Sequence, residues 1–183
     1  GRVFGEQRFP MRHGDRQFNP LPLFHLATIL PFNGCLATGA TFVGMEHFEP
    51  RAALELLQRE RCTVAFPAFS LVWKAILDLP EFADADLSAV RLINVNGDPD
   101  LTRPMAEKVP GAIQISPYGA TEGGGVIALA HLDDPLERRI GSAGRPFEGI
   151  QVRIVDPETG EEVPPNTLGE ITYRGWSLFQ GYH

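Results

Sequence analysis

Residues 115–125, ISPYGATEGGG, place three chemically capable side chains on a segment of small residues. A tyrosine ring such as that of Tyr118 can stack on a purine base, a contact worth ~1–3 kcal/mol. The Thr121 hydroxyl can donate to a phosphate oxygen, and the Glu122 carboxylate is a hard ligand of the kind that Mg²⁺ shares with phosphates. Glycine lets the backbone approach a ligand closely. These residue types predict a nucleotide and cation site; the alternative is an ordinary turn with Thr121 and Glu122 in solvent.

Short apolar runs alternate with amphipathic runs along most of the chain. The apolar runs predict strands at 40–45, 63–66, 90–95 and 112–116. Helical spacing of apolar residues predicts helices at 23–37, 50–61, 70–77 and 102–109. Pro31 should bend the first of these helices, and Ser70 should cap the third. Because strands that alternate with helices form βαβ units, we expect an α/β fold, with a mostly parallel sheet covered by helices.

The pattern changes after residue 137. Residues 149–155 and 169–175 alternate apolar and polar positions, which predicts antiparallel strands. The chain is therefore expected to divide in two. An α/β subdomain at 1–137 would carry the stretch at 115–125, and 138–183 would begin a small antiparallel β subdomain.

Two successive predicted strands end in glycine-bearing turns, VNGDPD at 95–100 and SPYGATEGGG at 116–125. In an open parallel sheet, ligands bind at the carboxyl ends of the strands. If these two strands are neighbours, we expect both turns to face one crevice.

Composition excludes several classes of protein. The chain has 183 residues, of which 43% are apolar, so it can build a real core. Its net charge of −7 gives no general reason to bind nucleic acid or an anionic membrane surface. No apolar run approaches the ~20 residues that span a bilayer, so we expect no transmembrane segment and a cytoplasmic location. Cys35 and Cys62 are expected to be reduced core residues, and no histidine stands at metal-ligand spacing.

Motifs in order along the chain resemble those of the adenylate-forming, or AMP-binding, superfamily of acyl-CoA synthetases, adenylation domains and luciferases. YGATE (118–122) resembles that family's Tyr-Gly-x-Thr-Glu motif, and PLPLFHLATIL (20–30) its Pro-Leu-Phe-His segment. The segments at 86–101, 140–156 and 169–183 resemble its adenine turn, its Gly-x-x-Gly-Arg-Pro segment and its Gly-Glu-x-x-x-Arg-Gly segment. The resemblance covers nearly all of the chain from about residue 15.

The resemblance implies a two-step reaction. A carboxylic acid reacts with ATP to give an acyl-adenylate and pyrophosphate, and a thiol, usually that of coenzyme A, then takes the acyl group. Tyr118 would lie against adenine, Thr121 would touch phosphate, and Glu122 would hold Mg²⁺. His25 would gate the acyl pocket, although a lone histidine in an apolar helix also serves as a core residue. The implied catalytic residues are Thr121, Glu122 and His25. The implied nucleotide contacts are Gly97, Asp98, Pro99, Ser116, Pro117, Tyr118, Gly119 and Thr121, and the implied acyl-substrate contacts are His25, Thr28, Asn96 and Ala120.

Three positions depart from the residues that are usual in this family. Asn96 stands where the family has the first of two glycines, Pro117 where glycine is usual, and Thr28 where glycine is common after the histidine. These departures concern acyl specificity more than nucleotide binding. Trp73 is expected in the core, with the lining of an acyl pocket as its alternative.

Other segments that the family uses are not among these residues. Its Ser/Thr/Gly-rich phosphate loop should precede residue 1, and its ribose-binding aspartate and mobile domain with the catalytic lysine should follow residue 183. We therefore expect a central part of the large N-terminal domain of a ligase, inactive alone and active in a longer parent. Its partners would be a small carboxylic acid, ATP and coenzyme A, with a homodimer as one way to cover exposed apolar surface.

Two other hypotheses stay open. The first is an amino-acid-activating adenylation domain, although residues 24–34 offer no acidic side chain for an amino group. The second is a truncated, non-catalytic homologue that binds a nucleotide or a protein partner.

Overall fold

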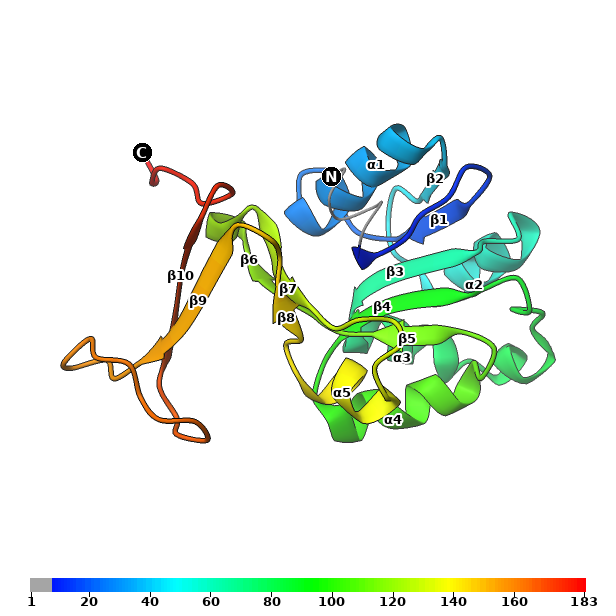
Figure 1. The fold of residues 1–183 in the computed structure, drawn as a ribbon. Coiled ribbons are helices and arrows are strands. Elements are labelled where there is room, and N and C mark those ends of the chain that lie inside the picture. The colour runs from blue at the N-terminus through cyan, green and yellow to red at the C-terminus, as the bar shows by residue number, and fades with distance from the viewer. Residues whose placement is uncertain (1–7) are drawn as a thin grey trace.

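A computed structural model describes residues 8–183, and its largest element is a five-stranded parallel sheet in the order β2-β1-β3-β4-β5 (Figure 1). The strands are β1 Arg16–Asn19, β2 Thr41–Gly44, β3 Val64–Phe69, β4 Leu92–Asn96 and β5 Ile113–Ile115. The sheet confirms the expected α/β fold. The sequence pattern did not predict β1, because its residues RQFN are mostly polar although Gln17 and Asn19 are buried. Residues 1–7 of the first expected subdomain lie outside the described residues.

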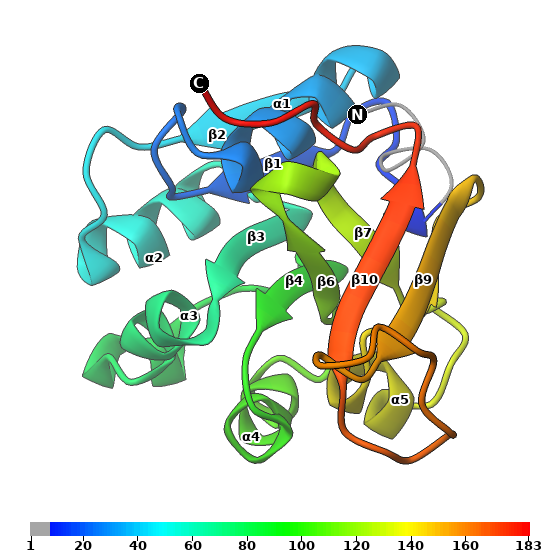
Figure 2. The same ribbon diagram turned by 90° about the vertical axis from the view of Figure 1, so that its left-hand side faces the viewer.

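Helices cover both faces of the sheet (Figures 1 and 2). The helices are α1 Leu26–Thr38, α2 Pro50–Arg59, α3 Ser70–Leu77, α4 Pro99–Lys108 and α5 Leu136–Gly141. On one face, α2, α3 and α4 enclose a core that includes Phe18, Trp73 and Ile93. On the other face, α1 and a neighbouring strand enclose a second core that includes Cys35 and Ile127. The parallel sheet is therefore the middle layer, and its edge remains available for a ligand.

Helix α2 shows why the predicted helices form. The carboxylate of Glu49 caps it by accepting hydrogen bonds from two main-chain N–H groups of the first turn (3.1 and 2.6 Å). Pro50 occupies the first turn, where a missing N–H costs nothing. Leu54 and Leu57 are buried on the face toward the sheet. The helix predicted at 50–61 is thus confirmed, although it ends two residues earlier than predicted, at Arg59.

Helix α3 has the predicted bounds, but the predicted Ser70 cap and the predicted start of α4 are wrong. Ser70 does not cap α3, since Phe69 holds the cap position and no side chain there accepts a main-chain N–H. Helix α4 begins at Pro99 rather than at Thr102, because the Asp98 carboxylate accepts an N–H of the first turn (2.8 Å). The N-terminus of α4 therefore reaches the end of β4 itself.

A second sheet follows in the order β6-β7-β8, and it corrects the interpretation of residues 115–125 as a loop. Its strands are β6 Pro117–Ala120, β7 Gly125–Leu129 and β8 Arg145–Pro146. A one-turn 3₁₀ helix at Thr121–Gly123 joins β6 to β7, so most of the stretch is an antiparallel hairpin. This hairpin lies beside the carboxyl ends of the parallel strands (Figure 1).

The antiparallel strands predicted at 149–155 and 169–175 are confirmed as β9 Ile150–Val155 and β10 Glu170–Gly175. They form a two-stranded sheet beyond the β6-β7-β8 sheet (Figure 1). The division of the chain at residues 137 and 138 stays a prediction.

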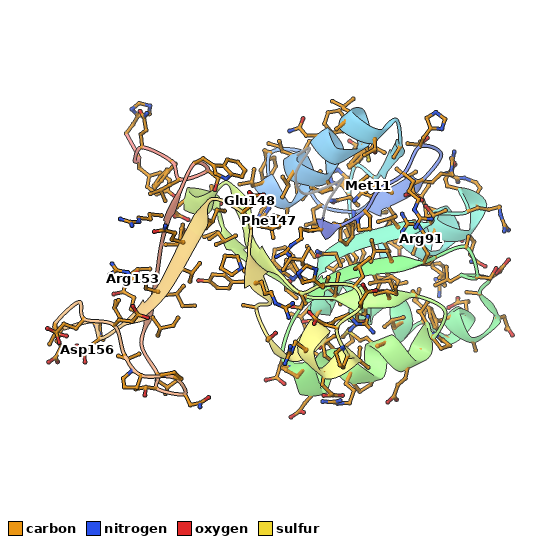
Figure 3. All side chains as sticks on the ribbon, viewed as in Figure 1. Met11, Arg91, Phe147, Glu148, Arg153 and Asp156 are labelled. Carbon is orange, nitrogen blue, oxygen red and sulfur yellow. The ribbon has the colours of Figure 1, made fainter. Side chains whose placement is uncertain are left out.

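An ion pair holds the opposite end of the parallel sheet. Arg91 immediately precedes β4, far from the β9–β10 hairpin (Figure 3), and its Nε donates to Oδ1 of Asp15 (3.2 Å) while its Nη2 donates to Oδ2. The Thr63 hydroxyl also donates to Asp15 (2.7 Å). Burial would raise the pKa of Asp15, but these hydrogen bonds outweigh it and hold the pKa below its usual range. The charge is thus satisfied within the fold, which indicates a structural role.

Residues 8–183 show no reactive thiolate, metal cluster or membrane-spanning helix. Cys35 and Cys62 are buried free thiols, and burial raises the pKa of each to about 12, so neither is a reactive thiolate. No group of three or more His, Cys, Asp or Glu side chains gathers there as a metal site. In the same part of the chain, no helix has both the length and the apolar character that a membrane crossing requires.

Candidate functional site

The crevice lies where β4 and β5 end. These strands are neighbours, with Asn94 opposite Ile115, so the segments that follow them leave the same edge of the sheet. Residues from both segments line two adjoining pockets, which share Asn96, Pro117 and Gly119. The expectation that both turns face one crevice is therefore confirmed.

The outer pocket lies between these two segments and helix α5, with a volume of about 390 Å³. It is lined by Asn96, Gly97, Pro99, Ser116, Pro117, Tyr118, Gly119, Ile140, Gly141, Ser142 and Ala143. Tyr118 is half-buried rather than fully exposed, because it also packs against the core beneath β7. A lining of glycine backbone, proline and an aromatic ring suits a flat, partly apolar group.

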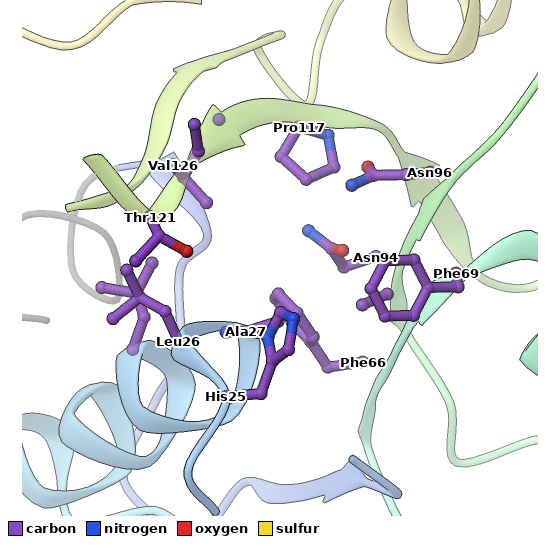
Figure 4. A pocket seen from close by; sticks show the side chains of 15 residues that line it. His25, Leu26, Ala27, Phe66, Phe69, Asn94, Asn96, Pro117, Thr121 and Val126 are labelled. Atoms are coloured by element: carbon purple, nitrogen blue, oxygen red, sulfur yellow. Dashed lines mark hydrogen bonds between the residues drawn. The ribbon is translucent and has the colours of Figure 1, made fainter. Parts of the chain in front are cut away.

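The inner pocket lies between α1, the ends of β3 and β4, and the β6–β7 hairpin (Figure 4), with a volume of about 240 Å³. It is lined by His25, Leu26, Ala27, Leu30, Phe66, Ala68, Phe69, Asn94, Asn96, Pro117, Gly119, Ala120, Thr121, Gly125 and Val126. Most of these side chains are apolar, and none is a carboxylate, lysine or arginine. A compact, mainly apolar group with few polar atoms fits such a lining.

The structure holds His25 at the wall of the inner pocket. It is the N-cap residue of α1, and its Nδ1 accepts the main-chain N–H of Ala27 (3.0 Å). Its ring meets that of Phe69 edge to face, with centroids 5.9 Å apart. Because Nδ1 is an acceptor here, Nε2 is the nitrogen that carries the proton in the neutral ring and can donate to a ligand.

The tip of the hairpin presents Thr121 and Glu122. Gly124 and Gly125 follow with φ of 79° and 108°, a backbone region that side chains rarely adopt, so glycine is required for this turn. Thr121 lines the inner pocket, whereas Glu122 lies at the rim and lines neither pocket. The glycines of this stretch therefore serve to turn the hairpin and to set both side chains at the mouth of the crevice.

The C-terminal segment holds Glu122 in place. Its Oε1 accepts the Tyr182 hydroxyl (2.6 Å), and its main-chain oxygen accepts the N–H of Phe179 (2.9 Å). The hydrogen bond from Tyr182 lowers the pKa of Glu122, so the side chain is a carboxylate at neutral pH. One of its two oxygens already has a partner, and the other remains for a ligand at the mouth.

Tyr182→Phe is expected to raise the pKa of Glu122 toward its usual value, because the hydroxyl that favours the charged form is gone. The carboxylate would then take up its proton at a higher pH than in the original chain. Carbon-detected NMR titration of the Glu122 side chain measures this directly. Tyr173→Phe serves as the matched control, and an unchanged pKa in Tyr182→Phe would contradict the contact.

Gly119→Ala is expected to destabilise the site. A Cβ at this position would lie 1.7 Å from the main-chain oxygen of Gly125 on the paired strand, so β6 and β7 would have to separate. We expect a loss of about 2–3 kcal/mol in the free energy of unfolding, measured by urea denaturation. Gly111→Ala, where a Cβ meets nothing within 4 Å, should change it by less than about 0.5 kcal/mol. Equal stabilities of the two variants would contradict the close pairing.

Most of the predicted site residues reach the pockets, and three do not. Asp98 caps helix α4, Glu122 stands at the rim, and Thr28 is buried with its hydroxyl donating to Oδ1 of Asn19 (3.3 Å). The predicted residues that line one or both pockets are His25, Asn96, Gly97, Pro99, Ser116, Pro117, Tyr118, Gly119, Ala120 and Thr121. Their chemical roles stay predictions.

Sequence reasoning missed several residues of the inner pocket, and Phe66, Ala68 and Asn94 are among them. Phe66 and Ala68 lie at a bulge in β3, where the register with β4 shifts between Ala65 and Ala68. Ala68 has φ of 59°, a strained conformation of the kind that gathers at functional sites. Asn94 could have been found, because it interrupts the apolar run LINVN at 92–96.

Comparison with known proteins identifies the family. The model for the family described as AMP-binding enzyme matches residues 2–183. The chain belongs to the AMP-binding enzyme family. This confirms the resemblance carried by the YGATE stretch and the motifs around it.

The AMP-binding relatives include plant ligases. The chain is 33% identical over 175 residues to 4-coumarate–CoA ligase 1 of Oryza sativa subsp. japonica. This match covers 92% of the chain and 31% of that ligase. It is 36% identical over 171 residues to 4-coumarate–CoA ligase of Pinus taeda, covering 88% of the chain and 31% of that ligase. The chain thus spans 31% of the length of each of these two relatives.

Solved structures share the AMP-binding fold. The amide bond synthetase McbA from Marinactinospora thermotolerans matches with a TM-score of 0.83 and 28% identity, over 97% of this chain and 36% of that chain. The N-terminal domain of FACL13 from Mycobacterium tuberculosis matches with a TM-score of 0.81 and 26% identity, over 97% and 44%. Both matches support the α/β architecture around the crevice.

Proposed function

We propose that this chain forms the ATP- and acid-binding part of an ATP-dependent carboxylic acid–thiol ligase. In this reaction the carboxylate attacks the α-phosphorus of ATP, pyrophosphate leaves with the electron pair of the broken P–O bond, and coenzyme A then displaces AMP from the acyl-adenylate. The observation that carries the proposal is the pair of adjoining pockets at the ends of β4 and β5, which share Asn96, Pro117 and Gly119. The printed names of the similar plant ligases support it.

The outer pocket would take the adenine. Tyr118 offers a ring face, and Gly97 and Pro99 line the same pocket. Ser116 adds a hydroxyl at the pocket wall, and its Oγ lies 3.4 Å from Oδ1 of Asn96. Asp98 contributes indirectly, because its carboxylate fixes the start of α4 beside the pocket.

Thr121 and Glu122 would act on the phosphates at the mouth. The Thr121 hydroxyl can donate to a phosphate oxygen, and a fixed donor of this kind stabilises the charge that develops in the transition state. Mg²⁺ fits the donor set here, because Glu122 keeps one carboxylate oxygen beyond the bond to Tyr182 and phosphate oxygens can complete the shell. When bound, Mg²⁺ spreads the negative charge of the reacting phosphates.

The inner pocket would take the acyl group. His25 is oriented by its bond to Ala27 and can donate from Nε2 to the carboxylate or the phosphate as they meet. Ala120 and Asn96 border the passage between the two pockets. Among residues 8–183 no carboxylate lines the inner pocket, so an amino acid would find no partner there for its ammonium group. This argues against the amino-acid-activating alternative.

The test uses the full-length gene product that carries this chain, with ATP, Mg²⁺, coenzyme A and a panel of carboxylic acids. We expect AMP and the matching acyl-CoA to form together, and only when an acid is present, as measured by mass spectrometry. ATP turnover that no acid stimulates would overturn the proposal. The 183-residue chain alone should release no acid-dependent pyrophosphate, and release by it would contradict the expectation that the site needs further segments.

A further inference from the structure

Asn94 is a buried polar side chain without a protein partner. It lies in β4 with no exposed surface, and neither Oδ1 nor Nδ2 has a hydrogen-bond partner among the described residues. Its amide lines the inner pocket and points toward the space between Thr121 and Pro117 (Figure 4). A polar group of this kind costs about 1–3 kcal/mol when it is buried without a hydrogen bond.

Apart from Asn96 at the end of β4, the neighbouring positions are apolar, so packing alone does not explain the amide. Along β4, Leu92 points to the same face and belongs to the core beneath β7. Across the sheet, Asn94 stands beside Ile115 of β5. The neighbouring strand β3 has a bulge before Ala68, where its register with β4 shifts. An apolar side chain of similar volume would satisfy this part of the core.

The other polar groups of the inner pocket either have partners or lie nearer to solvent. His25 uses Nδ1 to accept from Ala27, and Oδ1 of Asn96 lies 3.4 Å from the Ser116 hydroxyl. Thr121 is exposed at the mouth, whereas Asn94 is fully buried at the floor. An acid whose carboxylate meets the phosphate near Thr121 would therefore bring its remote end toward Asn94.

We propose that Asn94 selects acids that carry a neutral hydrogen-bonding group, a hydroxyl or an amide, at the end remote from the carboxylate. This inference rests on the proposed ligase function. The group is neutral, because no charged side chain lines the pocket among residues 8–183. The acid is compact, because the inner pocket has a volume of about 240 Å³. An amide side chain both donates and accepts, so it can serve either group.

Matched acids test the proposal in the full-length gene product. Acid-dependent exchange of labelled pyrophosphate into ATP is measured with benzoate, 3-hydroxybenzoate and 4-hydroxybenzoate, and with 3-phenylpropanoate and its 4-hydroxyphenyl counterpart. In at least one pair we expect the hydroxy acid to have a kcat/KM roughly 10- to 100-fold above that of its parent, because the parent acid leaves the amide unpaired. Hydroxy acids that are no better than their parents in any pair would overturn the proposal.

Asn94→Leu separates selection from a merely structural role. This variant should bring the ratio of the two kcat/KM values close to one, by lowering the value for the hydroxy acid and removing the unpaired amide that disfavours the parent acid. Asn33→Leu, on the exposed face of α1, should keep the original ratio. A purely structural role would lower both acids alike and leave the ratio unchanged, which would contradict selection by Asn94. If Asn94→Leu does not fold, the ratios of the original protein decide.

The same exchange assay distinguishes a wrong role for Asn94 from a wrong ligase assignment. Exchange with both members of every pair at equal efficiency would remove the role of Asn94 and leave the ligase intact. Exchange with no acid at all, from these pairs or from a broad panel, would overturn the ligase assignment and this inference with it.

Discussion

Glu122→Gln in the full-length protein is expected to lower acid-dependent AMP formation by about 10²- to 10³-fold. Glutamine keeps the size of the side chain and can still accept the Tyr182 hydroxyl, but it lacks the charge that attracts a cation. The loss should therefore come with a weaker dependence on Mg²⁺ than the original protein shows. Initial rates of AMP formation, measured across a range of Mg²⁺ concentrations, report both quantities.

The matched control for this variant is Glu170→Gln. Glu170 is exposed on β10 and lines neither pocket, so its replacement should leave both the rate and the Mg²⁺ dependence unchanged. A Glu122→Gln protein with the original rate and the original Mg²⁺ dependence would remove the cation role assigned to Glu122. The position of Thr121 and the two pockets would then need a different account of phosphate binding.

Trp73→Ala is expected to cost about 3–5 kcal/mol of the free energy of unfolding. Trp73 has no exposed surface and packs in the core between α3 and the sheet, and it lines neither pocket. The core role expected from its helix is thus the one that the structure supports. Urea denaturation of the chain measures the loss as a lower midpoint.

Trp73→Phe is the matched variant. The indole Nε1 of Trp73 has no hydrogen-bond partner among the described residues, so phenylalanine removes an unsatisfied donor while keeping most of the buried ring. We expect a cost of about 1 kcal/mol, well below that of Trp73→Ala. In the full-length protein, the order of preference among acids should stay the same in Trp73→Phe. A changed preference would mean that Trp73 reaches the acyl group after all.

The parts of the fold that follow from local periodicity could be predicted. Helix α2 combines a carboxylate cap, a first-turn proline and an apolar stripe, and these signals agree with one another. The strands of the C-terminal hairpin alternate apolar and polar residues along most of their length, as an antiparallel pair with one covered face does. The crevice could be predicted because ligands bind at the carboxyl ends of parallel strands, and two parallel strands that are neighbours end at the same edge of the sheet.

The parts that depend on tertiary packing could not be predicted. Strand β1 is mostly polar, and its place inside the sheet comes from its two parallel partners, the edge strand β2 and strand β3. The β6–β7 hairpin contains proline and several glycines, which are depleted in strands, so its pairing was hidden. The bulge at Ala68 needs a strained backbone that no local pattern announces.

Side-chain roles were the least predictable. The family resemblance implied a nucleotide contact for Asp98, but its carboxylate accepts a main-chain N–H of the first turn of α4 instead. Thr28 follows the histidine in the sequence, yet helix α1 turns it away from the pocket toward Asn19. Asn94 was a signal in the sequence, because it interrupts an apolar strand, but its role depends on the pocket that its amide lines.

The most direct test of the account is a crystal structure of the full-length protein with ATP analogue and a carboxylic acid bound. The account predicts adenine against Tyr118 in the outer pocket, the phosphate nearest the acid beside Thr121, and the acyl group in the inner pocket with its remote end at Asn94. A nucleotide bound elsewhere, with both pockets filled by protein segments, would contradict it.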